Sequence, residues 1–219
     1  MLNEVTNNRK AEKMSKQLWK PGNMLYPLPA VLVSCGDKAG NYNVLTVAWT
    51  GTICSDPAMV YVSVRKNRYS HHMLEETGEF YINLTTEALA FATDYCGVKS
   101  GKDLNKFEEM HLTPEMGMLS WAPMIKESPV CIACEVVRIE ELGSHDMFIA
   151  NVKGVYADEA YMDEKGKFDL IKAKPIVYSH GQYYGLGRYI GKFGYSVQKN
   201  PAKVKKASVH KTKANNKKA

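Results

Sequence analysis

The sequence predicts a mainly β protein, a small antiparallel β-barrel with helical insertions. Apolar runs of strand length recur along the chain, and several are separated only by the short turn that a β-hairpin requires. Aromatic residues make up 10% of the chain and include 13 tyrosines, which favours a sheet over a helical bundle. Closing such a sheet into a barrel removes its exposed edges. With 219 residues, 45% of them hydrophobic, we expect one main domain with a sizeable core.

The first third of the chain carries three expected strands after a polar entry. Residues 1–19 form an N-terminal extension in which we expect a helix and then a short strand at 17–19. The apolar run AVLVSCG at 30–36 is bounded by proline and glycine and predicts a buried strand. A turn containing glycine leads into NVLTVAWTG at 43–51, so these two runs form a hairpin. An Asp-Pro turn precedes the third strand, at 59–64.

Short helices then alternate with a fourth strand. Ser70 is expected to cap a helix that ends at Gly78, because serine is a favoured N-cap and glycine a favoured terminator. FYINLT at 80–85 is the fourth strand. A second helix is expected over 86–95, ended by Cys-Gly, and a third over the segment DLNKFEEM at 103–110.

Two long strands and a short one complete the expected fold. The runs at 130–142 and 147–158 are joined by a Gly-Ser turn and predict a long hairpin. A short strand at 175–178 follows, and then a segment rich in glycine and tyrosine. This gives about six or seven strands with two or three short helices, in a domain that we place at residues 20–196.

The net charge of +6 comes from the C-terminal end of the chain. From Lys199 onward there are eight lysines and no acidic residue, so the remaining residues carry a net charge of −2. The domain is therefore not a basic nucleic-acid binder, and we expect residues 197–219 to be a disordered, lysine-rich tail. Such a tail either keeps the protein in solution or binds a polyanion.

Cysteine usage and hydropathy predict a reduced, cytoplasmic protein. The chain has five cysteines, an odd number, and its N-terminus lacks the apolar centre of a secretory signal. No apolar run approaches the roughly 20 residues that span a bilayer. Cys131 and Cys134 form a CxxC pair inside an expected strand, where residues three apart point to opposite faces. We therefore expect buried packing cysteines and not a metal or redox pair.

No motif for a nucleophile, a metal or a dinucleotide fold is present in the sequence. GxSxG, HExxH, a Walker loop and a GxGxxG after a strand are all missing, and the six histidines lack metal-ligand spacing. Arg65, Arg68 and Ser70 instead form a basic-hydroxyl cluster where a strand meets a helix. Two guanidinium groups at a helix N-terminus can hold a phosphate. On these residues alone, a solvated loop is an equal alternative.

Five stretches, taken together in their order and spacing, resemble a known family. They are NYNVLTVAWTG (41–51), DPAMVYVSVRKNRYSHHML (56–74), EFYINLTT (79–86), DYCGVKSGKDLNKF (94–107) and LGSHDMFIANV (142–152). With these stretches, the chain resembles the flavin reductase-like family over roughly residues 20–196, and within it the flavoredoxin-like branch. The resemblance implies the FMN-binding type of antiparallel split β-barrel with short helices.

The resemblance also implies noncovalently bound FMN in a groove at a homodimer interface. The residues of the strand expected at 43–51 would run beside the isoalloxazine and ribityl groups. The remaining residues would meet the polar edge of the flavin or its phosphate. The implied cofactor-binding residues are Asn43, Val44, Leu45, Thr46 and Trp49, then Ser63, Val64, Arg65, Arg68, Tyr69 and Ser70, and finally Ser100 and Lys106.

No catalytic residue is assigned, because hydride transfer to a flavin needs no general base or nucleophile from the protein. His145 lies where many reductases of the family have a Gly-Asp-His turn, and there it would contact a nicotinamide. Here Ser144 replaces the aspartate, and His145 is alternatively an exposed hairpin residue. Cys96 either approaches the flavin or packs as an inert thiol.

The function that the resemblance implies is an FMN-dependent oxidoreductase. It would take electrons from NADH or NADPH and pass them to a flavin, a ferric complex or a partner protein. One alternative is an FMN electron-transfer protein without its own nicotinamide site. Another is a non-catalytic split barrel that binds a different cofactor, such as haem or a deazaflavin.

Overall fold

The computed structural model describes residues 15–197. The chain divides after Leu186 into two units, and each is described by itself. In the second unit the described residues contain one 3₁₀ turn, Tyr195–Val197. The expected N-terminal helix and lysine-rich tail lie almost wholly outside the described residues. The strand expected at 17–19 is wrong, because these residues have no regular structure and their side chains are exposed.

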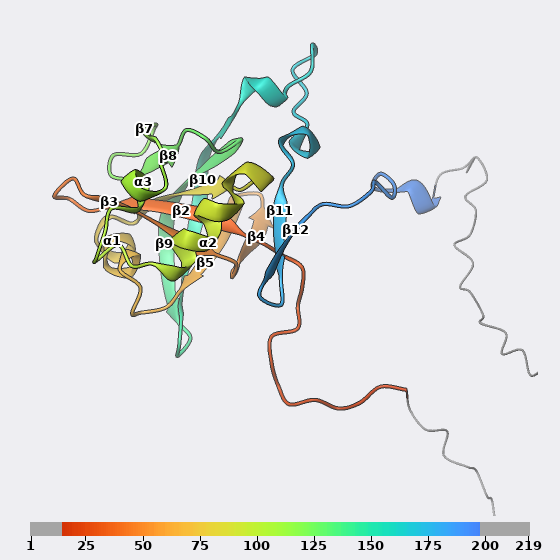
Figure 1. The fold of residues 1–219 in the computed structure, drawn as a ribbon, viewed down its shortest axis with the longest axis horizontal. Coiled ribbons are helices and arrows are strands. Elements are labelled where there is room, and N and C mark those ends of the chain that lie inside the picture. The colour runs from red at the N-terminus through yellow and green to blue at the C-terminus, as the bar shows by residue number, and fades with distance from the viewer. Residues whose placement is uncertain (1–14, 198–219) are drawn as a thin grey trace, which may run out of the picture. The chain divides into compact units, whose positions relative to one another are not determined.

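The first unit is built on a seven-stranded antiparallel sheet (Figure 1). Its order is β3-β2-β6-β9-β10-β5-β4, and every neighbouring pair is antiparallel. The mainly β, antiparallel fold expected from the sequence is therefore confirmed. The strands are β2 (Val31–Gly36), β3 (Tyr42–Val47), β4 (Thr50–Ser55), β5 (Ala58–Val64), β6 (Glu79–Leu84), β9 (Val130–Glu141) and β10 (Asp146–Ala157).

Two smaller sheets accompany the main sheet. β1 (Leu28–Pro29), β11 (Ile176–Ser179) and β12 (Gln182–Gly185) form one, and β7 (Pro114–Met116) pairs with β8 (Pro123–Ile125) in the other. All five strands are only two to four residues long, and the sequence predicted only β11, which has a short apolar run after a proline, while the other four give no periodic signal.

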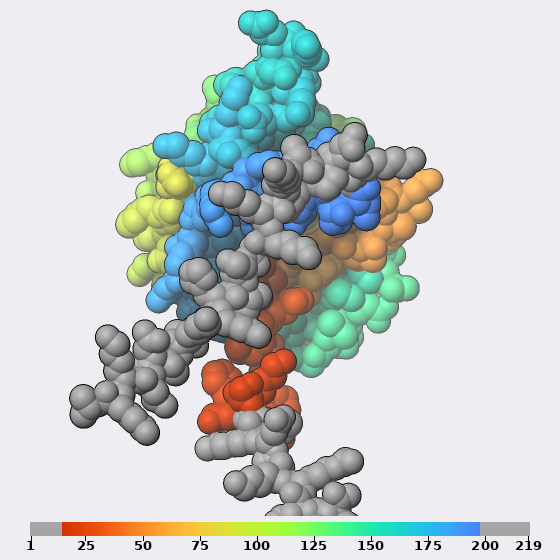
Figure 2. Space-filling model, turned by 90° about the vertical axis from the view of Figure 1, so that its right-hand side faces the viewer, coloured from red at the N-terminus to blue at the C-terminus, as the bar shows by residue number. Residues whose placement is uncertain are grey.

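The helices are short and connect the strands. They are α1 (Ser70–Thr77), η1 (Glu87–Leu89), α2 (Ala90–Val98), α3 (Lys106–Glu109), η2 (Glu159–Tyr161) and η3 (Leu170–Ala173). The segment between β10 and β11 carries η2 and η3 and projects from the unit, coloured cyan in Figure 2. Among residues 15–197 the structure contains no helix that is long and apolar enough to cross a bilayer.

The strand expected at 43–51 is wrong, because the chain breaks it into β3 and β4. β3 pairs with β2, whereas β4 pairs with β5, so the two segments lie at opposite edges of the sheet. The break falls at Ala48 and Trp49, and the carbonyl of Trp49 accepts a hydrogen bond of 2.8 Å from the amide of Ser63. No glycine or proline marks this bend, so the apolar run reads as one strand.

Ser70 does not cap helix α1, contrary to the expectation. It is the first residue of the helix, Tyr69 holds the N-cap position, and no side chain caps the helix. The Ser70 hydroxyl instead accepts a 2.7 Å hydrogen bond from the side-chain amide of Asn43. The expected end is confirmed, since Gly78 has φ 66° and its amide bonds to the carbonyl of Leu74.

The second helix begins as expected and ends later. The Thr86 side chain accepts a 3.3 Å hydrogen bond from the Leu89 amide, and η1 then continues into α2, which reaches Val98. Gly97 is therefore inside the helix. A Cβ there would lie 3.3 Å from the Cβ of Thr46, so glycine serves close packing of α2 on β3. The third helix is shorter than predicted, since α3 covers only Lys106–Glu109.

The two CxxC thiols are buried on opposite faces of β9. Cys134 belongs to the main core cluster with Phe80 and Phe148, whereas Cys131 packs with Tyr81 in another cluster. Burial raises the pKa of Cys131 to about 11 and that of Cys134 to about 12. The prediction of separate packing cysteines is confirmed.

Candidate functional site

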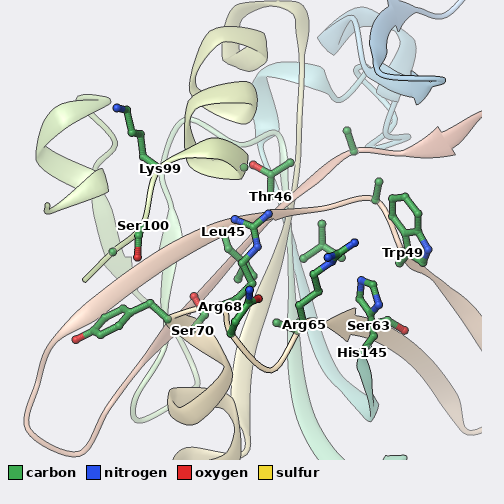
Figure 3. Close-up of a pocket in the computed structure, with 18 of the residues that line it drawn as sticks. Leu45, Thr46, Trp49, Ser63, Arg65, Arg68, Ser70, Lys99, Ser100 and His145 are labelled. Atoms are coloured by element: carbon green, nitrogen blue, oxygen red, sulfur yellow. The ribbon is translucent and has the colours of Figure 1, made fainter. Parts of the chain in front are cut away.

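A cavity of about 630 Å³ opens beside β3 and the β5–α1 loop (Figure 3). Its lining comes from β3 and the following bend, the end of β5, the start of α1, the loop after α2, the β9–β10 hairpin and the small sheet. Of the residues implied by the resemblance, all except Val44 line it. They are Asn43, Leu45, Thr46, Trp49, Ser63, Val64, Arg65, Arg68, Tyr69, Ser70, Ser100 and Lys106, with His145.

The structure therefore brings one set of sequence-distant residues to one cavity, although their contact with a flavin stays a prediction. Val44 differs from the others. Its side chain is fully buried in the core cluster that contains Leu32 and Cys96. Its backbone carbonyl accepts a 2.8 Å hydrogen bond from Lys106 Nζ, so Val44 contributes to the cavity by holding the lining residue Lys106.

The cavity is positively charged. Among residues 15–197, four basic side chains line it, those of Arg65, Arg68, Lys99 and Lys106, and no aspartate or glutamate does. Arg65 and Arg68 are exposed, and in Figure 3 their guanidinium groups point in a common direction between Thr46 and the Trp49–His145 end. Two cationic forks without a competing carboxylate suit a dianionic phosphate.

The turn from Arg65 to Ser70 is held by its own backbone. The Arg68 amide donates to the Arg65 carbonyl, and the His71 amide donates to the Arg68 carbonyl, both at 2.9 Å. These two hydrogen bonds form consecutive turns, so both arginine side chains extend from one short segment that leads into helix α1. The basic-hydroxyl cluster predicted from the sequence is thus a structured turn and not an extended loop.

Lys106 contributes to the cavity wall as well as to its charge. It is 4% exposed, and its amine donates to the carbonyls of Val44 (2.8 Å) and Cys96 (3.0 Å). Burial is the main cause that lowers the pKa of Lys106 to about 8, and the charge of Arg68 acts in the same direction. Lys106 thus joins β3 to α2 with two of its three donors and has one left for a ligand.

Close backbone approach is required at Gly101. A Cβ at this position would lie 2.2 Å from Oδ1 of Asn43, which is far too close. Asn43 is buried and also bonds to Ser70, so its amide joins β3, α1 and the loop after α2. The polar residues of three segments are in this way fixed around one side chain.

Trp49 and His145 form the other end of the cavity. Their rings are stacked, with centroids 6.2 Å apart and planes 10° from parallel. His145 is half-buried, and its Nδ1 lies 2.9 Å from the Ser144 hydroxyl. Burial and the charges of Arg65 and Arg68 lower the pKa of His145. His145 therefore lines the cavity and is not a freely exposed hairpin residue.

Several lining residues were missed from the sequence. Tyr178 comes from β11 and Tyr183 from β12, and Lys99 follows helix α2. Burial raises the pKa of Tyr183 to about 12, with Asp94 adding to the effect. The tyrosine-rich composition near the C-terminal end was the one available signal, but nothing in it shows that the segment returns to β3. Cys96 is buried in the core, its pKa raised to about 11 by burial, which supports the packing alternative.

The fold and the basic cavity define a flavin reductase-type split barrel, and the comparisons with known proteins agree. The sequence model described as "Flavin reductase like domain" matches residues 24–187. This chain therefore belongs to the flavin reductase-like family. The family and the split-barrel fold that the resemblance implied are confirmed.

Solved structures of two flavoredoxins are similar to this chain. One, from Desulfovibrio vulgaris, is 30% identical with a TM-score of 0.78, and the other, from Methanosarcina acetivorans, is 29% identical with a TM-score of 0.75. Each match covers 84% of this chain and 100% of the other. An uncharacterized protein of Archaeoglobus fulgidus is 31% identical over 141 residues, 64% of this chain and 78% of its own length.

Proposed function

We propose that this protein binds FMN noncovalently in the basic cavity and acts as an oxidoreductase. It would take electrons from NADH or NADPH and pass them to a flavin, a ferric complex or a partner protein. The observation that carries the proposal is the cavity itself, in which four basic side chains and no carboxylate meet an aromatic end in a family of flavin proteins. The donor set fits a ligand with a phosphate at one end and a planar ring at the other.

The residues have separate roles in this proposal. Arg65, Arg68 and Ser70 hold the phosphate, while the β3 residues lie beside the ring system. FMN supplies the hydride and electron chemistry when it is bound. The chain supplies orientation, exclusion of water by Leu45 and Val64, and a positive field that stabilises negative charge on the ligand. His145, which stacks on Trp49, would contact a second planar group.

A specific observation favours a second function, electron transfer without a nicotinamide site. The two similar structures of about 30% identity are both named flavoredoxins. Ser144, which precedes His145, also departs from the Gly-Asp-His turn expected of nicotinamide-using relatives. In this version the cavity holds FMN, and the electrons arrive from and leave to protein partners.

We also propose that the protein works as a homodimer with the flavin at the interface. Strand β9 and the turn after it expose three apolar side chains, those of Val137, Ile139 and Leu142. Exposed apolar side chains that gather on one surface are typical of interfaces between protein subunits. Sedimentation of the flavin-loaded protein measures the mass, and a monomer would contradict this part.

The visible spectrum of the purified protein tests the cofactor. We expect a yellow protein with flavin maxima, and release of FMN on denaturation, identified by chromatography. A haem or deazaflavin spectrum, or failure to take up added FMN, would contradict the proposal.

Anaerobic mixing with NADH or NADPH then separates the two functions. Bleaching of the flavin band supports the reductase. If dithionite bleaches the band and neither nicotinamide does, the reductase is wrong and the carrier stands.

A further inference from the structure

A buried aspartate–histidine pair lies directly beside the cavity without lining it. Asp146, the first residue of β10, is 2% exposed, and His71 in α1 is 6% exposed. Asp146 Oδ2 and His71 Nε2 are 2.8 Å apart. The imidazole also meets the ring of Phe148 edge-on, with centroids 5.3 Å apart. Such a pair is costly to bury, so its retention calls for a physical explanation.

Three further charged groups complete the cluster. Glu75 Oε2 lies 3.2 Å from His71 Nδ1, so each ring nitrogen faces one carboxylate. On the other side, Lys66 Nζ lies 3.4 Å from Asp146 Oδ1 and 2.6 Å from Glu141 Oε2. Within the described residues, Asp146 Oδ1 accepts no hydrogen bond of good geometry. A metal ion at this cluster would have to replace the hydrogen bond at a ring nitrogen of His71. We therefore treat the cluster as a set of direct contacts and call Lys66, His71 and Asp146, with Glu75 and Glu141, the clamp.

Each central member of the cluster is the sequence neighbour of a cavity residue. Asp146 follows His145, Lys66 follows Arg65, and His71 follows Ser70. The clamp therefore joins three segments that each carry a cavity residue, the end of β5, the start of α1 and the start of β10.

The backbone connects the clamp to both arginines. The His71 amide donates to the Arg68 carbonyl, and the Arg68 amide donates to the Arg65 carbonyl. Asp146 is paired across the sheet with Val64, the residue before Arg65. The backbone of His71 is therefore hydrogen-bonded to the turn that carries both guanidinium groups, and Asp146 joins the His71 ring to β10.

We propose that His71 and Asp146 are positioning residues that preorganise the Arg65–Ser70 turn for the phosphate of the ligand. The inference rests on the proposed function, because it assumes FMN in the cavity. It assigns the hydrogen bond between Nε2 and Asp146, and not the contact between Nδ1 and Glu75, as the one that holds the turn. Loss of this bond leaves the arginines present but free to adopt other conformations, which lowers phosphate affinity.

A pair of substitutions separates the two ring nitrogens. The amide of glutamine can take the place of Nε2 and that of asparagine the place of Nδ1. His71→Gln keeps a donor for Asp146, whereas His71→Asn loses it. We expect His71→Asn to raise the Kd for FMN about tenfold or more, as for loss of a charge-assisted hydrogen bond, and His71→Gln to stay within about threefold of wild type.

Riboflavin, which lacks only the phosphate, is the second probe. His71→Asn should change the Kd for riboflavin by less than about twofold, so that the preference for FMN over riboflavin falls with the FMN affinity. Glu76→Gln, an exposed change on the same helix, is the matched control and should leave both values unchanged. Fluorescence quenching of each free flavin on binding gives the Kd.

Several outcomes would overturn the proposal. Equal losses for FMN and riboflavin would mean general damage to the cavity, and an unchanged FMN affinity in His71→Asn would mean that the clamp is irrelevant to the phosphate. If His71→Asn does not fold, Asp146→Asn is measured against the same two criteria. A wild-type protein that binds neither flavin contradicts the proposed function instead.

Discussion

Arg65 and Arg68 are two exposed cations of the cavity, and no carboxylate among the described lining residues neutralises them. We expect Arg65→Ala and Arg68→Ala each to weaken FMN binding by about 1.5–3 kcal/mol, because each removes a charge-assisted contact with the phosphate. Equilibrium dialysis measures the retained flavin. Lys165→Ala is the control, since Lys165 is an exposed cation of the segment between β10 and β11 and does not line the cavity. Wild-type flavin occupancy in both site variants would refute the assignment.

At the residue scale, the sequence predicted the side chains that face the cavity better than the contacts that hold those side chains in place. The cluster of Arg65, Arg68 and Ser70 stands in one short segment, so its spacing is readable. The bond between Asn43 and Ser70 and the pair of His71 with Asp146 join residues 27 and 75 positions apart. Nothing local marks such partners, because their side chains meet only through the sheet register.

At the scale of elements, helix α3 is the shortest α-helix among the described residues, and one of its side chains joins two other elements. Lys106 donates to a carbonyl of β3 and to one of α2, and substitution by methionine leaves both carbonyls without this donor. We expect Lys106→Met to lower the free energy of unfolding by about 1–3 kcal/mol at pH 9.5, measured by urea denaturation of the flavin-free protein.

The effect of Lys106→Met should depend on pH in a defined direction. Burial lowers the folded-state pKa of Lys106 to about 8 from the ordinary 10.5, so the unfolded chain binds the proton more tightly. Between these values the unfolded state holds more protons, and wild-type stability rises with pH relative to the variant by up to about 1.4 kcal/mol per pH unit. The loss should therefore be smaller at pH 7.5 than at pH 9.5. A loss that is constant or shrinks with rising pH contradicts the assigned cause.

Elements with a strong local signal were predicted, and those decided by tertiary contacts were not. The hairpin of β9 and β10 has long apolar runs around a Gly-Ser turn, and it is found almost to the residue. The bend at Trp49 has no such signal, because the interaction that stabilises it is a hydrogen bond from Ser63 on another strand. Ser70 has the residue type of a cap, but Asn43 competes for its hydroxyl group.

At the scale of the whole molecule, the two sides of the cavity belong to different sheets, and one sheet is held less firmly than the other. The arginine side belongs to the seven-stranded sheet, whereas Tyr178 and Tyr183 belong to the sheet of β1, β11 and β12. The latter is joined to the rest by backbone bonds from Ile176 to Thr85 (3.3 Å) and from Glu87 to Lys174 (2.9 Å). Figure 1 shows this small sheet beside the body of the unit and not within it.

Amide hydrogen exchange should reveal this difference. Because local opening is easier where few hydrogen bonds and little packing oppose it, we expect the amides of β11 and β12 to exchange at least about tenfold faster than those of β5 and β10. Mass spectrometry of the exchanged peptides measures the rates. Equal protection in the four strands would mean that the two sheets open as one unit.

The sequence predicted a single antiparallel domain but not the order of its strands. Hairpin spacing correctly placed β2 beside β3 and β9 beside β10. The pairing of β10 with β5, which creates one wall of the cavity, is between segments about 85 residues apart and has no spacing signal. The small sheet likewise brings residues 28–29 against residues 177–178, which only the folded chain shows.

Because the two walls of the cavity are held by the fold to different degrees, the affinity for a ligand and its dissociation rate depend on different walls. If FMN binds as proposed, we expect its affinity to depend mainly on the arginine wall and its dissociation rate on the wall that opens first, the tyrosine side. Changes near Thr86 or Pro175, which do not line the cavity, would then alter residence time while the equilibrium constant stays nearly fixed. For an electron carrier, that is the difference between a cofactor kept through many cycles and one exchanged as a substrate.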